Sequence, residues 1–471
     1  MDWVYSQLSW LDDAGSTAHM TQAEQLEDSL DLAQVPNLLE VAIPLFLLGM
    51  GVEIGIAAVK NLPLYRINNS INSISQGIFS ELVTTAYEWM FVFPYCYIWT
   101  HWSLYRFPSE YCNWGTLLLG IFGVDFFYYW FHRMAHEWAI GWAGHHVHHS
   151  SEDYNLTTAV RQGLLQAIVS PWFMMPLAFV FPPRIFYFWR QVNTIYQFYI
   201  HTELIRSMGF LETFLNTPSH HRVHHGRQPY CINVNYGGVF IIFDKMFGTF
   251  AAEEERVIYG LVHPLISWSP MEQFGYARYM LSNMMATPGS PLRKLSVLFR
   301  DPGWVDGEIL PIPEVTEFQL YNRSTSWVLS IYSILALLLS IIFFYFTHIC
   351  NWYGLTLAGK IGAAFFDILS LFSLAAIFDR RSFAIPLELL RLITTGLIIA
   401  LIVHAIPSQP LVMTLWGWYG IMTTLFLLGM WNGTDNLKDE VAWPIMVKGW
   451  HGEEACAKME LAQREHKPKV E

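Results

Sequence analysis

Charged residues are scarce in this chain, and positive charge is the scarcer sign. Asp, Glu, Lys and Arg together make up 14% of the 471 residues, and the formal net charge is −12. Soluble domains usually contain about 25% of these residues, so the composition disfavours an ordinary soluble protein. The shortage of basic residues argues against nucleic acid as a partner. Residues 1–36 contain no lysine or arginine, and we expect no signal peptide, because such a peptide begins with a basic stretch.

Cysteine is equally scarce and shows no paired spacing. The chain has five cysteines, which are Cys96, Cys112, Cys231, Cys350 and Cys456. An odd number without a framework argues against a disulfide-stapled fold, a zinc ribbon and an iron–sulfur cluster. We therefore expect free thiols that serve as small apolar residues. Short repeats and low-complexity segments are also missing, so a repeat architecture is not expected.

Apolar residues are abundant, and they occur in long runs. They make up 53% of the sequence, and nine runs are candidates for crossing a hydrocarbon layer of about 30 Å. The predicted fold class is all-α, a polytopic membrane helical bundle with about nine transmembrane helices. The candidate spans cover residues 38–59, 80–100, 115–131, 162–181, 185–200, 327–347, 361–378, 385–405 and 411–430.

The distribution of basic residues predicts the orientation of these spans. Lys60 and Arg66 follow the first span, so this loop is predicted to be cytosolic and the N-terminus lumenal. Nine spans then place the C-terminus and all histidine clusters on the cytosolic side. Lys467 and Lys469 near the end of the chain resemble a dilysine retrieval signal, which predicts a multi-pass protein of the endoplasmic reticulum membrane.

The chain divides into five predicted parts. Residues 1–37 form an acidic lumenal segment, and residues 38–270 form a membrane domain that contains the histidine clusters. A polar connector covers residues 271–326. The last two parts are a four-helix membrane region, residues 327–431, and a cytosolic tail, residues 432–471.

Histidines are concentrated in one stretch of the sequence. Eleven of the 18 lie between His132 and His225, and imidazole is the commonest metal ligand at neutral pH. The spacings of three and four residues place imidazoles on one helix face, while adjacent histidines point about 100° apart and can reach two different ions. We predict a site for two metal ions at the cytosolic edge of the membrane. The predicted ligands are His132, His136, His145, His148, His149, His201, His221, His224 and His225.

Four further residues near these clusters receive predictions. His146 and His220 break the spacing, and we interpret them as outer-shell or exposed residues. Asp125 lies two helical turns before His132 and is predicted to accept the N–H of a ligand imidazole, or else to act as a capping or solvated acid. Glu137 is predicted to bring a carboxylate near the site, with a solvated role as the alternative. Asp125 and Glu137 are therefore the candidate catalytic carboxylates. Ligand type alone leaves zinc, copper, iron and nickel open.

The pattern of three histidine clusters between membrane spans resembles the fatty acid hydroxylase and sterol desaturase superfamily. Within it, the chain is most similar to the alkylglycerol monooxygenases, which cleave ether lipids. The residues that carry this resemblance are Trp130–Glu137, His148–Ala159, His201–Glu203, Thr217–Gly226, Asn235–Gly238 and Phe247–Phe250. The four C-terminal spans fit these enzymes too, because most of the superfamily ends soon after the third cluster. The acidic N-terminus and His146 look like departures from the pattern.

The resemblance implies a specific chemistry. It implies two iron ions, tetrahydrobiopterin as cofactor, molecular oxygen, and an alkylglycerol substrate embedded among membrane lipids. Oxygen would enter at the carbon next to the ether oxygen, and the hemiacetal would collapse to a fatty aldehyde and a glycerol derivative. No residue of the sequence marks the pterin site.

Two other functions remain open at this point. The histidine clusters also fit another lipid hydroxylase or desaturase, acting on a sterol or a fatty acyl chain, and histidine-rich loops occur in metal transporters. A membrane scaffold with a relic site is a third alternative. For an enzyme, we expect the lipid chain to arrive sideways from the bilayer between the third and fifth spans. Phe126, Phe127, Trp172 and Phe173 are candidate walls of this route, with lipid-facing packing as their alternative role.

Overall fold

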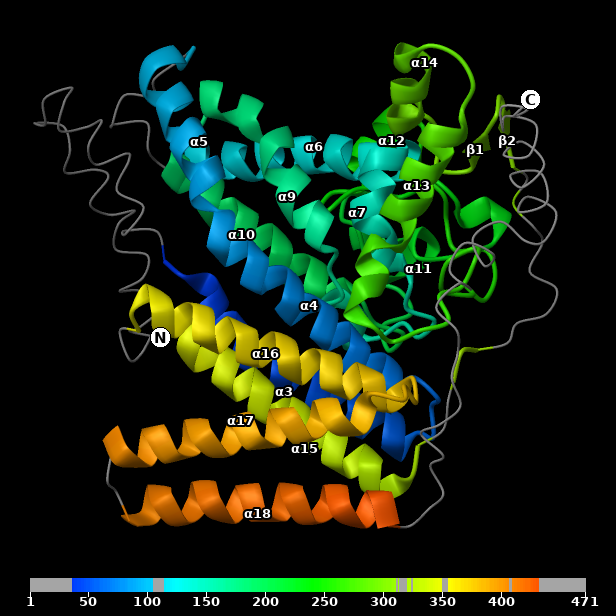
Figure 1. The fold of residues 1–471 in the computed structure, drawn as a ribbon. Coiled ribbons are helices and arrows are strands. Elements are labelled where there is room, and N and C mark those ends of the chain that lie inside the picture. Colours follow the sequence, from blue (N-terminus) through cyan, green and yellow to red (C-terminus); the bar gives the residue numbers. More distant parts are fainter. Residues whose placement is uncertain are drawn as a thin grey trace, which may run out of the picture.

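The computed structural model describes residues 36–104, 114–310, 312, 320–322, 325–349, 355–405 and 409–431. Helices dominate this part of the chain (Figure 1), which confirms the all-α prediction for the described residues. The paired strands within it are β1 (Trp304–Val305) and β2 (Glu308–Ile309), which form a two-stranded antiparallel hairpin.

The helices of the N-terminal part surround the histidine clusters. Their bounds are α3 (Leu38–Val59), α4 (Ile67–Tyr87), α5 (Trp89–Trp102), α6 (Trp114–Glu137), α7 (Ala139–His149), α8 (Leu156–Ala159), α9 (Leu164–Phe173), α10 (Pro183–Ile200), α11 (Pro218–His224) and α12 (Ile242–Phe247). Short 3-10 turns cover Met175–Phe179, Gly209–Thr213 and Pro229–Cys231. Among them, α6 packs against α7 and α10, and α10 also contacts α11; Figure 1 shows α7 and α11 on the same side of the molecule as the connector helix α13 (Gly275–Ala286).

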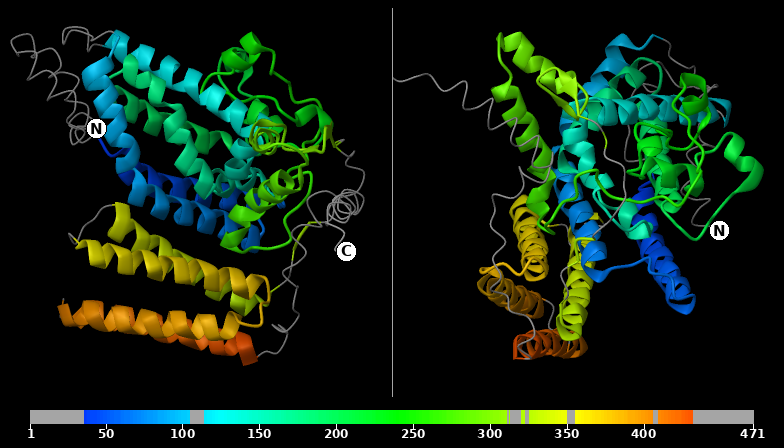
Figure 2. Two further views of the ribbon diagram at one scale, coloured as in Figure 1. Left: turned by 45° about the horizontal axis from the view of Figure 1, so that its top comes forward. Right: turned by 90° about the vertical axis from the view of Figure 1, so that its right-hand side faces the viewer.

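The C-terminal part contains the connector helices and four long helices. The connector holds a 3-10 turn at Pro270–Phe274, α13 (Gly275–Ala286), α14 (Pro291–Ser296) and a second turn at Val297–Phe299. The long helices are α15 (Trp327–Phe344, extended by a π-helical turn at Tyr345–Ile349), α16 (Leu357–Phe378), α17 (Ala384–Ala405) and α18 (Gln409–Trp431). Figures 1 and 2 show them together on one side of the molecule, where α15 and α16 also pack against α4.

Five helices of the described chain are long and apolar enough to cross a membrane. They cover Leu38–Val59, Trp327–Ile349, Leu357–Phe378, Ala384–His404 and Gln409–Gly429. The structure therefore supports a multi-pass membrane protein, while four of the nine predicted spans lack this support. The apolar run at 162–181 is divided between α9 and the following 3-10 turn, and the run at 80–100 is divided at Glu88 between α4 and α5.

Most of α4 lies outside the predicted spans, because the first half of this helix is polar although it is buried. Its first half carries Asn69, Ser73 and Gln76, each at most 2% exposed. The side chain of Arg161 donates to Ser73 Oγ at 3.0 Å and to the Asn69 carbonyl at 3.1 Å, while Gln76 bonds the side chain of Gln273. Hydropathy cannot identify such a helix, because its polar groups face other polar groups of the protein rather than water.

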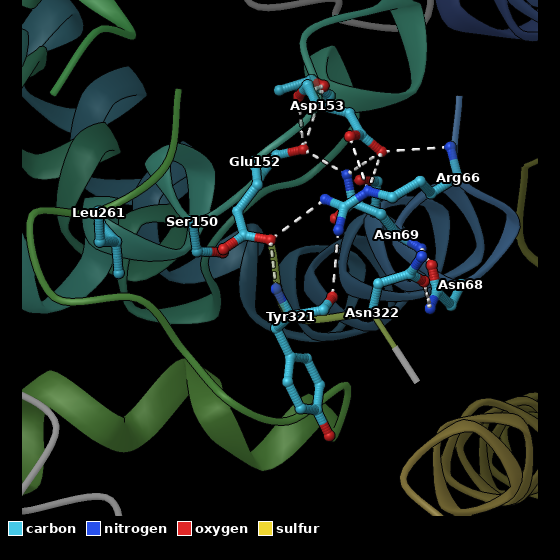
Figure 3. A network of polar contacts seen from close by, with 12 residues as sticks. Arg66, Asn68, Asn69, Ser150, Glu152, Asp153, Leu261, Tyr321 and Asn322 are labelled. Carbon is cyan, nitrogen blue, oxygen red and sulfur yellow. Dashed lines mark hydrogen bonds and ion pairs between the residues drawn. The ribbon is translucent and has the colours of Figure 1, made fainter. Parts of the chain in front are cut away.

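A network of ion pairs fixes the loop that follows the second histidine cluster (Figure 3). Arg66 Nε lies 2.8 Å from Asp153 Oδ1, and Arg66 Nη2 lies 3.2 Å from Glu152 Oε2. Glu152 also accepts the backbone N–H of Tyr321 at 3.1 Å, and Asn69 donates to Asp153 at 2.9 Å. One arginine thus ties the end of α7 to the start of α4 and to the connector.

Replacing Arg66 by alanine is expected to lower the free energy of unfolding by about 3 kcal/mol, because two largely buried carboxylates lose their cation. The melting temperature of the detergent-solubilised protein measures this effect. Arg293→Ala, which changes an exposed arginine of α14, is the control and should melt like the unchanged chain. Equal melting temperatures for Arg66→Ala and Arg293→Ala would show that the network does not stabilise the fold.

Candidate metal centre

The nine histidines predicted as ligands come together in two groups. The first group contains five imidazoles and the second contains four, and the candidate ligand nitrogens of each group all lie within 4.8 Å of one another. All nine side chains are buried. The first group is His132, His136, His145, His149 and His224, and the second is His148, His201, His221 and His225.

Helical spacing explains how the histidines divide. His132 and His136 occupy the last two turns of α6 on one face, and both belong to the first group. His148 and His149 are neighbours on α7 but belong to different groups, as the angle of about 100° between successive residues requires. The residue after α10 adds His201 to the second group from outside the three clusters.

Backbone carbonyls fix the tautomers of four imidazoles. The Nδ1 atoms lie close to a carbonyl oxygen, at 2.8 Å for His132 (Tyr236), 2.9 Å for His148 (Arg161), 2.6 Å for His201 (Gln197) and 2.9 Å for His224 (Val234). A carbonyl oxygen only accepts, so each Nδ1 carries the hydrogen and each Nε2 keeps a free lone pair. These lone pairs are directed into the two groups.

Some of these Nε2 atoms lie close together, although neither atom of the pair carries a hydrogen with which to form a hydrogen bond. His148 Nε2 and His201 Nε2 are 3.3 Å apart, although both are unprotonated in the tautomers that the carbonyls impose. Protonation does not relieve this contact at neutral pH, because burial lowers the pKa of His148 to about 4. Burial likewise lowers the pKa of His224 to about 3. A bound cation is the remaining way to offset the repulsion between the lone pairs.

The spacing of the nitrogens fits metal ligation. Nε2–Nε2 separations are 2.9 Å for His132 and His145, 3.0 Å for His145 and His149, and 3.0 Å for His201 and His221. Two ligands on one ion at bond lengths near 2.1 Å and a right angle are about 3.0 Å apart. The Nε2 atoms of His136 and His224 are buried without a hydrogen-bond partner within the described part of the chain. The residues therefore fit one metal ion in each group.

Asp125 has a different partner from the one predicted. It is fully buried, but it accepts the backbone N–H groups of Val239 and Phe240 and the Asn193 amide, each at 2.8 Å, instead of the N–H of an imidazole. A β-carbon at Gly238 would lie 2.6 Å from Asp125 Oδ1, so only glycine permits this approach. Asp125 thus anchors the loop whose Tyr236 carbonyl orients His132, one step further from the metals.

Glu137 also departs from the prediction. Its carboxylate pairs with Arg133 Nε at 2.8 Å, one helical turn back, and its side chain is 35% exposed. The guanidinium of Arg133 lies over the ring of Trp130. Glu137 therefore belongs to the outer face of α6, and the solvated alternative describes it better than a role beside the metals.

His146 and His220 lie outside both groups and are buried. His146 Nδ1 lies 3.1 Å from the Trp142 carbonyl and its Nε2 lies 3.3 Å from the Glu272 carbonyl. His220 packs against the ring of Phe250, and its own carbonyl accepts from Asn235. Both fit the outer-shell interpretation and contradict the alternative of an exposed position.

Two supporting residues, Gln166 and Asp244, were not predicted from the sequence. Gln166 of α9 accepts from His145 Nδ1 at 2.5 Å, and Asp244 of α12 accepts the backbone N–H groups of Tyr236 and Gly237 at 2.7 and 2.8 Å. Gln166 lies on an otherwise apolar helix, and an amide in such surroundings needs a hydrogen-bond partner. This is the signal that could have identified it. Asp244 is separated from the nearest cluster by loop residues, and nothing in its local sequence indicates that it turns inward.

A largely apolar cavity of about 370 Å³ reaches the second histidine group. It is lined by residues of α3, α4, α6, α9, α10 and α15, and His201 is among them. Leu47 of α3, which is 37% exposed, marks an opening toward the outside of the bundle. The amides of Gln162, Gln166 and Gln197 also line the cavity.

The four aromatic residues predicted as walls lie elsewhere. Phe127 and Phe173 pack against the core between α6 and α10, Phe126 packs against Phe243, and Trp172 is 46% exposed. The cavity is lined instead by other aromatic residues, which are Phe46, Tyr128, Phe131, Phe186, Phe198 and Phe344. The four residues are therefore not cavity walls: Phe126, Phe127 and Phe173 pack against other residues of the protein, and lipid-facing packing stays a prediction for the exposed Trp172.

Comparison with known proteins agrees with this geometry. The fatty acid hydroxylase family matches residues 117–249, which include all nine histidines. Alkylglycerol monooxygenase of Xenopus tropicalis is 45% identical over 373 residues, covering 77% of this chain and 82% of its own. The human enzyme of the same name is 42% identical, covering 76% and 82%, and that of Danio rerio is 42% identical, covering 76% and 81%.

The chain belongs to the alkylglycerol monooxygenase family. This confirms the resemblance drawn from the histidine clusters and the segments around them. A protein named ornithine lipid hydroxylase, from Rhizobium tropici, is 28% identical over 145 residues, or 30% of this chain. No solved structure matches the chain.

Asp125→Asn is expected to weaken metal binding by about 10- to 100-fold, the usual cost of losing an outer-shell partner. The amide keeps one acceptor oxygen, so one of the two loop N–H groups loses its bond and the Tyr236 carbonyl shifts away from His132. Competition with a chelator, followed by metal analysis, measures the affinity. Glu137→Gln is the matched control and should bind metal normally. An unchanged metal affinity in Asp125→Asn would show that Asp125 does not help to position the metal ligands.

Proposed function

We propose that this family member is a membrane di-iron monooxygenase that cleaves the ether bond of alkylglycerols. Its products would be a fatty aldehyde and a glycerol derivative, formed with molecular oxygen and a reduced pterin. The observation that carries the proposal is a buried centre of nine histidines at the inner end of an apolar cavity. The names of the relatives supply the substrate class.

The carbon next to the ether oxygen is the chemically favoured point of attack. A lone pair of the ether oxygen stabilises a radical on this carbon, so its C–H bond is the weakest of the alkyl chain. When bound, the iron ions supply the redox chemistry that activates oxygen. The protein contributes position and the exclusion of water. Hydroxylation gives a hemiacetal, which separates into aldehyde and alcohol without further oxidation.

The cavity suits a molecule with one long alkyl chain and a small polar end. The walls contributed by Phe46, Phe186 and Phe198 are apolar, and each methylene removed from water contributes about 0.8 kcal/mol. The amides of Gln162 and Gln197 line the same cavity as His201, and they can hold glycerol hydroxyls beside the second histidine group. This arrangement supports a binding mode in which the ether bond would lie between the apolar walls and the histidine centre.

The full topology belongs to this proposal. Beyond the five apolar helices, α6 has 24 residues, which at 1.5 Å per residue give a length of about 36 Å, enough to cross a bilayer. The pairs α4–α5 and α9–Met175–Phe179, together with α10, would complete nine crossings. Lys60, Arg66 and the lysines near the C-terminus support a cytosolic histidine centre in the endoplasmic reticulum membrane.

The direct test is turnover of 1-O-hexadecylglycerol by iron-loaded membranes that contain the chain. Hexadecanal is expected with oxygen and reduced pterin together and not when either is omitted. Cholesterol and palmitate serve as competing substrates of the other lipid hydroxylases. A hydroxylated sterol or acyl product without ether cleavage would overturn the assignment of the substrate.

The two histidine groups are expected to lose metal separately. His136→Ala and His221→Ala should each reduce bound iron from about two ions per chain to about one, because each removes a ligand of one group, and both should abolish ether cleavage. Elemental analysis of the purified variants measures the iron. His146→Ala and His220→Ala are the controls, which should keep two ions and most of the activity. Full activity in His136→Ala and His221→Ala would contradict a shared two-metal site.

A further inference from the structure

A second cavity reaches the histidine centre from another side. Its volume is about 190 Å³, and its inner wall contains His136, His149 and His224, all of the first group. The apolar cavity described above contains His201 of the second group, and the two cavities share no lining residue. Two molecules can therefore approach the centre at the same time without competing for space.

The second cavity lies between the connector, the histidine-bearing helices α6, α7 and α11, and the loop residues between Gly226 and His263. Its side walls include Trp142 of α7 and Tyr276 of α13, two helices that pack together (Figure 1). Ile309 and Ile312 line its outer end and are 63% and 38% exposed. A molecule dissolved in water can thus enter here, whereas a lipid chain gains more from the larger apolar cavity.

The lining residues fit a flat, nitrogen-rich ring system. Asp301 is the only acid among the described residues that line the cavity. Its Oδ1 accepts the Gly303 N–H at 2.7 Å, and the carboxylate retains lone pairs for further donors. The two adjacent N–H donors of a 2-amino-4-oxopteridine match such a carboxylate, while the rings of Trp142 and Tyr276 offer apolar faces for stacking. The Tyr276 hydroxyl is bonded to the Pro302 carbonyl at 2.8 Å, which fixes its ring.

The proposed reaction requires an electron donor close to the histidine centre. Oxygen insertion converts R–CH2–O–R′ and O2 into R–CH(OH)–O–R′ and water, and this balance requires two electrons and two protons. A tetrahydropterin supplies both and leaves as the dihydropterin. The donor must come close to the metals while the alkylglycerol occupies the apolar cavity. The second cavity meets this condition, because its wall includes candidate ligands of the first group.

We propose that the cavity between α7, α13 and the residues around Asp301 is the binding site of the reduced pterin, with Asp301 holding the pyrimidine edge of the ring. This inference rests on the proposed function, from which it takes the need for a two-electron donor. It adds the residues that hold the donor, and it assigns the two histidine groups different neighbours: donor beside the first, lipid beside the second.

The test is anaerobic equilibrium dialysis of tetrahydrobiopterin against the purified full-length chain, with and without iron. Asp301→Asn should raise the dissociation constant of the pterin at least tenfold, because it places an amide N–H against the N–H donors of the ring while an oxygen remains for Gly303. Asp306→Asn is the matched control, an exposed aspartate of the same hairpin, and should bind pterin normally. Iron content and binding of 1-O-hexadecylglycerol should be unchanged in both variants.

A second variant guards against a folding defect in Asp301→Asn. Ile309→Trp adds bulk at an exposed position of the outer end and should also weaken pterin binding at least tenfold without loss of iron. Unchanged pterin binding in both variants, or a loss of alkylglycerol binding in place of pterin binding, would overturn the assignment. Pterin-dependent ether cleavage by the unchanged chain, together with unchanged pterin binding in Asp301→Asn and Ile309→Trp, would refute this site but not the proposed function. Pterin binding that depends on Asp301, in a chain that does not cleave ethers, would support this site and refute the proposed function.

Discussion

The structure depends on keeping neutral imidazoles buried with their Nε2 lone pairs facing one another. Such lone pairs repel, and burial far from water removes the solvent that would otherwise screen them. The chain meets this demand by giving the Nδ1 hydrogens of His132, His148, His201 and His224 to backbone carbonyls. A carbonyl oxygen can only accept a hydrogen bond, so the hydrogen of each imidazole stays on Nδ1. The Nε2 atom of each therefore remains available as a metal ligand.

Three of these carbonyls, those of Tyr236, Arg161 and Val234, come from loops, whereas that of Gln197 belongs to α10. The loops need their own support. Asp125 and Asp244 each accept two backbone N–H groups of the Tyr236–Phe240 segment, and Arg66 holds the segment that follows His149. Asp125, Asp244 and Arg66 are therefore not ligands; they hold the loops that position the ligands. Their positions also explain why α4 is polar, because Asn69 and Ser73 complete the hydrogen bonds of these loops.

The sequence could predict the parts of the site that local periodicity controls. His148 and His149 differ in direction on any α-helix, so their separation into two groups follows from spacing alone. The direction of a carboxylate does not follow in this way. Asp125 and Glu137 both lie on α6. Asp125 turns inward to the backbone of Val239 and Phe240, which is distant in sequence, whereas Glu137 pairs with Arg133 on its own helix. Hydropathy found the long apolar helices but missed most of α4, whose polar side chains are satisfied inside the protein.

The division of the histidines into two groups gives the centre two separate sides. Under the proposed function, a lipid that remains in the bilayer would use the cavity bounded by α3, α4, α6, α9, α10 and α15, because the outer end of the other cavity is lined by Ile309 and Ile312 of the connector. A polar electron donor would instead use the second cavity, because passing the apolar walls of the first would cost it hydrogen bonds with water. Under the proposed function, each reactant would therefore be sorted by its own solvation before it reached the two histidine groups. The placement of the centre at the ends of α6, α7 and α10, rather than at their middle, is what allows both routes to exist in one small fold.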